Sequence, residues 1–135
     1  KPEKVEWASQ NMLVLGLIVV LGIGLHLFNF WYKMMFAELA GMQTALAPSD
    51  GFGLIKATFS NPVYVVLYII WLVAIWFHLS HGFWSAMQTI GINGKVWFNR
   101  WKAIGIVYVT VLMLAFVAVV LAFYFGIAPS LCAAA

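Results

Sequence analysis

Two histidines inside long apolar stretches are the residues of this sequence best suited to chemistry. His78 lies in the apolar run 71–86, and His26 lies in the run 21–28. A charged side chain in the middle of a membrane helix costs about 2.5 kcal/mol or more, so ionisable residues there are rare and usually functional. The neutral imidazole is the commonest metal ligand in proteins and a frequent axial ligand of haem iron. The two histidines therefore predict a metal or haem centre within a membrane.

The composition predicts the fold class. Of the 135 residues, 65% are hydrophobic and only 8% are charged, whereas a soluble domain has about 25% charged residues. Three apolar runs, at about 10–32, 63–87 and 103–128, exceed the roughly 20 residues that a membrane-spanning helix needs. Strands of a membrane barrel would be shorter and would alternate apolar with polar residues. The sequence therefore predicts an all-α membrane protein, with residues 1–135 forming a single transmembrane domain.

Several kinds of site are excluded by residue type. The single cysteine, Cys132, cannot form an internal disulfide, hold an iron–sulfur cluster alone or provide a C-x-x-C-H haem attachment motif. The sequence contains no glycine-rich phosphate loop and no Ser-His-acid set, and its four acidic residues lie outside the apolar runs. We therefore do not expect this chain itself to transform a soluble substrate. Its seven basic residues are explained by membrane orientation, so no nucleic-acid partner is expected.

The basic residues predict which ends of the helices face the cytoplasm. Five fall on one side of the membrane and two on the other: Lys1, Lys4, Lys95, Arg100 and Lys102 against Lys33 and Lys56. Lysine and arginine are enriched in cytoplasmic connections, so the side with five should be cytoplasmic. The first helix is therefore expected to run from the cytoplasm to the outer side, the second to return to the cytoplasm, and the third to run outwards again.

The connections carry recognisable turn and cap signals. The segment 47–51 is a turn cluster, and 91–94 is a glycine-containing turn between the second and third helices. Asn61 before Pro62 is typical of an N-cap followed by proline at the first helical position. The second helix is therefore expected to start there.

The positions of the two histidines along their helices separate them. His26 lies 16 residues after Gln10, or about 24 Å along a helix, which places it towards the outer side. His78 lies 15 residues after Val63 on a helix that runs the other way, which places it towards the inner side. The two histidines therefore cannot bind one iron. Since the third apolar run contains no histidine, each needs a partner ligand elsewhere.

Small residues near the histidines leave room for a flat cofactor. Gly22 stands four positions before His26, and Ala74 and Gly82 stand four positions either side of His78, on the same helix faces. A porphyrin edge could lie there, although helix–helix packing also favours small residues. His81 could hydrogen-bond a haem propionate, or simply cap the last turn of its helix.

Three segments carry a family resemblance: Lys1–Met12, His26 with Phe30-Trp31, and Phe77–Gly94, which contains His-Leu-Ser-His-Gly-Phe-Trp-Ser. They resemble the cytochrome b membrane subunit of succinate dehydrogenase and fumarate reductase, of the single-polypeptide, two-haem type. The resemblance covers nearly the whole chain, but only the last three of the family's five helices.

The resemblance implies a five-helix haem-binding bundle with two haems b stacked across a bacterial inner membrane. It implies His26 as a ligand of the outer, distal haem and His78 as a ligand of the inner, proximal haem. The partner histidines would lie on two further helices, upstream of Lys1 or on a companion chain. The resemblance does not imply that His81 is an iron ligand. Some relatives use a glutamate two residues before the proximal ligand for proton return, whereas this sequence has Trp76.

The resemblance also implies partners. Flavoprotein and iron–sulfur subunits would dock on the cytoplasmic side, and electrons would pass between them and menaquinone near the outer face. Asn29, Tyr32 and Lys33 follow His26 towards that face. They are polar candidates for the vicinity of the quinone, against an ordinary role at the membrane interface.

Two other classes of protein stay open. One is another bis-histidine membrane cytochrome. Many such cytochromes carry two histidine ligands on the same helix, and this sequence has no pair of histidines at the required spacing. The other is a haem-free transporter or structural subunit, in which the histidines would form a proton relay or bind substrate. A reduced-minus-oxidised absorption spectrum distinguishes the cytochromes from the haem-free class.

Overall fold

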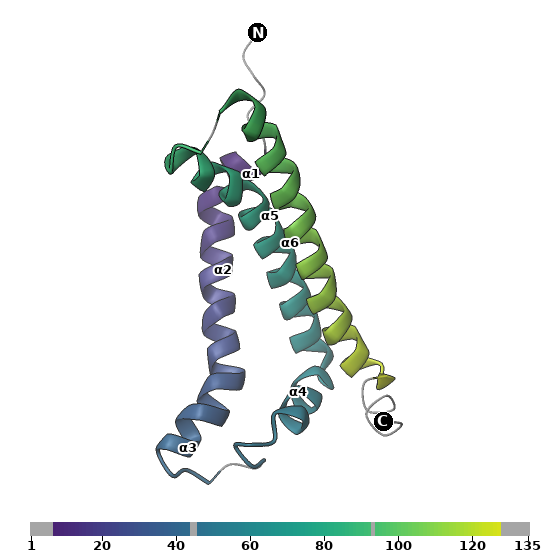
Figure 1. Ribbon diagram of the computed structural model, residues 1–135. Helices are drawn as coiled ribbons and strands as arrows, with labels where there is room; N and C mark the ends of the chain where they lie inside the picture. Colours follow the sequence, from purple (N-terminus) through teal and green to yellow (C-terminus); the bar gives the residue numbers. More distant parts are fainter. Residues whose placement is uncertain (1–6, 44–45, 93, 128–135) are drawn as a thin grey trace. The chain divides into compact units, whose positions relative to one another are not determined.

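The computed structural model describes residues 7–43, 46–92 and 94–127 (Figure 1). The described part is helical, with no strand. Three helical stretches are long and apolar enough to cross a membrane: Met12–Leu39, Pro62–Thr89 and Val96–Tyr124. The predicted fold class, an all-α membrane protein with three potential spans, is therefore confirmed.

The first stretch is a composite helix. It follows a short helix, α1 (Trp7–Gln10), and consists of α2 (Met12–His26), a π-helix, η1 (Leu27–Phe36), and a last turn, α3 (Ala37–Leu39). It continues past Tyr32, the predicted end, because Lys33 ends the apolar run without ending the helix. Lysine, methionine, alanine, glutamate and leucine are all good helix formers.

Glycines in the left-handed conformation end the first two spans. Gly41 has a φ of 63°, and its N–H donates to Glu38 while the N–H of Met42 donates to Ala37. Gly91 has a φ of 85° and ends the second span with the same pattern of hydrogen bonds. Both ends are Schellman motifs, in which glycine avoids the steric penalty of a side chain.

The second span, α5 (Pro62–Thr89), begins where the sequence predicts. The Asn61 Oδ1 atom accepts a hydrogen bond of 2.9 Å from the N–H of Val63, which confirms the N-cap. Before it lies α4 (Gly51–Phe59), which the sequence analysis missed. Asp50, in the predicted turn cluster, caps this helix through a 2.8 Å bond from the N–H of Gly53.

The third span, α6 (Lys95–Tyr124), begins eight residues before the predicted start at 103. The apolar run starts late because charged and aromatic residues fill the first two turns, but none of them breaks a helix. Arg100 lies 5.3 Å from the ring centroid of Trp97, an attractive cation–π arrangement. The helix ends before Gly126, whose φ is 72°.

The chain divides into two compact units. Unit 1 comprises Lys1–Val19 and Trp71–Phe116, and unit 2 comprises Val20–Ile70 and Val117–Ala135. His78 belongs to unit 1 and His26 to unit 2. The single transmembrane domain stays a prediction.

Each unit has its own tertiary contacts. In unit 1, the indole N–H of Trp71 donates to the carbonyl of Val19 at 3.1 Å, and that of Trp76 donates to Thr110 Oγ1 at 2.9 Å. In unit 2, Phe52 of α4 packs against Phe123 of α6, with ring centroids 5.2 Å apart. These contacts join α5 to α2 and α6 within unit 1, and α4 to α6 within unit 2.

Candidate functional site

His26 ends α2, immediately before the π-helix. Its ring centroid lies 5.0 Å from that of Phe30 and 6.1 Å from that of Tyr68, and the Tyr68 contact is edge-to-face. The side chain is nevertheless exposed on unit 2. Part of the surface of this imidazole, in the middle of a potential span, is therefore not covered by this chain.

Gly22, predicted to leave room beside His26, is buried. That place is therefore already covered by the chain's own atoms, and the role of Gly22 towards a cofactor stays a prediction. Gly24 is exposed instead, and a methyl group built there would meet nothing within 4 Å in the described structure.

His78 lies on α5 in unit 1 and is half-buried. Its Nδ1 atom is buried without a hydrogen-bond partner in the part of the chain that the structure describes. Most buried polar atoms have such a partner, and one without it is costly. An imidazole nitrogen in this situation suits coordination of a metal, since neutral histidine carries one nitrogen lone pair for that purpose.

The small residues near His78 are packed differently from one another. Ala74 is 4% exposed, and Gly82 faces the side chain of Met12, with a built Cβ 3.5 Å from the Met12 methyl carbon. Sequence analysis missed Gly16 of α2, where a built Cβ would lie 3.4 Å from Cε1 of His78. No local signal could identify Gly16, because the contact depends on which face of α2 meets α5.

His81 lies in a polar and aromatic neighbourhood at the end of α5. Its ring packs edge-to-face on Trp84, with centroids 4.8 Å apart, and Lys102 Nζ lies 5.4 Å from the Trp84 ring centroid. Trp84 Nε1 is buried and has no acceptor within the described ranges. Donors and a cation around one indole suit an anionic group, which is consistent with the predicted propionate contact of His81.

The three residues predicted for the quinone vicinity lie in different surroundings, although all belong to η1. Asn29 is fully buried, and its amide donates to the Tyr68 hydroxyl at 3.5 Å. Tyr32 is exposed and stacks on Phe28, with centroids 5.6 Å apart. Lys33 Nζ lies 5.8 Å from the centroid of the same Phe28 ring. The structure thus brings Tyr32 and Lys33 together and sets Asn29 apart from them.

The residues present fit two single-histidine haem sites. The described residues contain no group of three or more histidine, cysteine or acidic side chains that could hold a metal ion alone. Haem iron needs only axial ligands from protein, because the porphyrin fills the equatorial positions. The exposed imidazole of His26 in unit 2 could supply one such ligand. The buried Nδ1 atom of His78 in unit 1, which has no hydrogen-bond partner among the described residues, could supply another. Cys132 lies outside the described residues.

In comparisons with known proteins, no family model, no curated protein and no solved structure matches this chain. The resemblance to the cytochrome b subunits therefore rests on the sequence motifs alone and stays a hypothesis.

Proposed function

We propose that this chain contributes three helices to a five-helix, di-haem cytochrome b, the membrane anchor of a succinate:quinone oxidoreductase or quinol:fumarate reductase. One observation carries the proposal. A histidine lies inside a potential span in each unit: His26, with an exposed side chain, in unit 2, and His78 in unit 1, where His81 also lies. The Nδ1 atom of His78 is buried and has no hydrogen-bond partner among the described residues. Ionisable residues inside a membrane are energetically costly, so they are rare and usually have a function.

In this proposal the two histidines serve separate haems. His26 ligates the distal haem and His78 the proximal haem, and helices outside this chain supply the second ligands. Haem b supplies one-electron transfer, with a potential set by axial ligation, burial and nearby hydrogen bonds. The chain's own residues bind and orient the two haems and exclude water from them.

The proposed partners follow from the resemblance. A flavoprotein and an iron–sulfur subunit dock on the cytoplasmic face of a bacterial inner membrane, and menaquinone reacts near the outer face. The exposed surface of the spans supports further helices. The most apolar window of Met12–Leu39 has only 11% of its residues buried within the chain. The rest of that surface is available to lipid and to other helices.

A haem-free proton relay is the second candidate. It is favoured by the polar contacts of unit 2, where Asn29 donates to Tyr68 and the Tyr68 ring packs on His26. A histidine inside a span is typical of proton relays, and the Tyr68 hydroxyl provides a second proton-bearing group in its neighbourhood.

The deciding experiment is an optical spectrum of the native complex, purified through a tag on this chain. The cytochrome proposal expects b-type α-bands in the reduced-minus-oxidised spectrum and two haems b for each copy of the chain. A complex without haem would refute it and leave the proton relay.

A further inference from the structure

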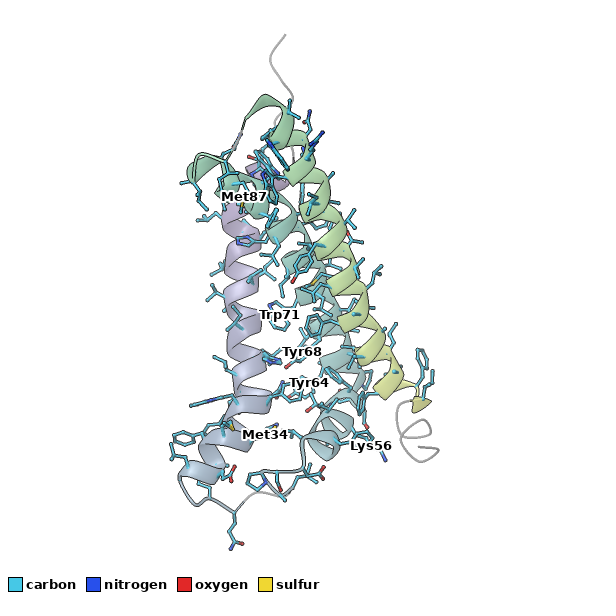
Figure 2. All side chains as sticks on the ribbon, viewed as in Figure 1. Met34, Lys56, Tyr64, Tyr68, Trp71 and Met87 are labelled. Atoms are coloured by element: carbon cyan, nitrogen blue, oxygen red, sulfur yellow. The ribbon has the colours of Figure 1, made fainter. Side chains whose placement is uncertain are left out.

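We propose that Asn29 and Tyr68 form a positioning pair that fixes the orientation of the His26 imidazole and, through it, the properties of the iron that His26 binds. The inference rests on the proposed function and adds a role for two residues that do not ligate iron. Figure 2 shows Tyr68 extending from α5 towards the helix that carries His26 and Asn29.

The pair is the most deeply buried polar contact of unit 2. Asn29 is 0% exposed and Tyr68 is 3% exposed. The Asn29 amide donates to the Tyr68 hydroxyl at 3.5 Å, a long hydrogen bond between η1 and α5. The Asn29 Oδ1 atom is buried and has no hydrogen-bond partner among the residues that the structure describes. Asn29 is therefore costly to bury, since a leucine of similar size would leave no polar atom unsatisfied.

Aromatic packing transmits the position of Tyr68 to His26. The Tyr68 ring meets the His26 ring at 68° with centroids 6.1 Å apart, an edge-to-face arrangement. Phe59 of α4 packs on Tyr68 at 5.2 Å and at an angle of 88°. Phe30 packs on His26 at 5.0 Å and on Tyr68 at 6.2 Å. Movement of the Tyr68 ring would therefore change the contacts that hold the imidazole plane.

The π-helix places Asn29 in this position. It begins at Leu27, directly after His26, and its wider turns replace the α-helical register. Such departures from α-helix are often found at functional sites. Asn29 is the only buried residue of η1. In the register of the π-helix, an amide and not an apolar side chain therefore packs into unit 2.

The test uses the native complex with two variants of the pair, Asn29→Leu and Tyr68→Phe. The first replaces the amide by an apolar group of the same branched shape, and the second removes only the hydroxyl. Thr110→Val is the matched control, because it removes a hydroxyl that accepts a partly buried hydrogen bond from Trp76 in unit 1. The spectral component lost in His26→Ala identifies the haem to be followed.

Two readouts report on imidazole orientation rather than on stability. The first is the midpoint potential of that haem. The second is its ferric electron paramagnetic resonance spectrum, whose g-values depend on the angle between the two axial ligand planes. We expect both pair variants to keep two haems but to shift the g-values of the distal haem. We also expect the ratio of reduced to oxidised distal haem at a fixed ambient potential to change about threefold, the size of one weak hydrogen bond.

The outcomes separate this inference from the proposed function. Wild-type complex without haem refutes both. If wild type and variants contain two haems and neither variant shifts the potential or the g-values, the positioning role is wrong while the cytochrome stands. The positioning role is also wrong if Thr110→Val shifts the midpoint potential or the g-values of the distal haem as much as Asn29→Leu does. If Asn29→Leu fails to fold, Tyr68→Phe decides, since it keeps the ring that packs on His26.

Discussion

Gly16 of α2 faces His78 of α5, and a Cβ built at Gly16 would lie 3.4 Å from Cε1 of the imidazole. This distance is an ordinary van der Waals contact for a methyl group, but it leaves no room for a longer side chain. A side chain larger than alanine at position 16 would therefore push the backbone of α2 and the His78 ring apart within unit 1. In the proposed cytochrome, this contact fixes the ring plane of the proximal ligand.

Substitution at Gly16 should therefore act through His78. Gly16→Ala should keep the proximal haem, because the added methyl group only touches the ring. Gly16→Leu should displace the ring and lose most of the proximal haem, since ligand positioning by neighbours is worth about 10–100-fold in metal affinity. The haem content and redox titration of the purified complex measure this.

Gly24→Leu is the control, because a Cβ built at position 24 would meet no described residue outside its own helix backbone within 4 Å, and because Gly24 belongs to unit 2. Equal loss of the proximal haem in both leucine variants would contradict the contact.

The cap of α5 gives a prediction about stability. Asn61→Ala should destabilise the protein by about 1 kcal/mol, because the N–H of Val63 loses its acceptor. Asn61→Ser should retain most of the stability, since serine is a good N-cap. Thermal unfolding of the complex in detergent, followed by circular dichroism, measures the difference. If the alanine and serine variants melt at the same temperature, the cap contributes nothing.

The predicted topology is tested by labelling in intact cells. In a Cys132→Ser background, a cysteine placed by Ser49→Cys should react with an impermeant thiol reagent, and one placed by Asn93→Cys should not. The reason is the excess of basic residues on the side of Lys95, Arg100 and Lys102. The reverse pattern would exchange the proximal and distal assignments of His26 and His78, although not the ligation itself.

The features that could be predicted from the sequence are those with local causes. The spans follow from apolar runs longer than a bilayer is thick, and the start of α5 follows from Asn61 and Pro62. The helix α4 also has a local signal, because the cap residue Asp50 precedes Leu54 and Thr58, which are buried and lie four residues apart on one helix face. The residues around Asp50 are equally typical of a turn, so they do not by themselves predict the helix.

The remaining features depend on how helix faces meet. The π-helix Leu27–Phe36 has no residue pattern that separates it from an α-helix, so the burial of Asn29 could not be foreseen. The pairing of Gly16 with His78 joins positions far apart in the sequence. The hydrogen bond from Trp76 to Thr110 is likewise a property of packing, and it gives Trp76 a structural role that the sequence did not suggest.

The most direct test of the central claim compares His26→Ala with His78→Ala in the purified native complex, by haem content and redox titration of the α-band. The account predicts that the two variants lose different spectral components, because the histidines lie in different units and serve different haems. His26→Ala should also lower reactivity with menaquinone while succinate oxidation by a soluble dye survives. Loss of the same component in both variants, with the same one left behind, would contradict the two-haem account.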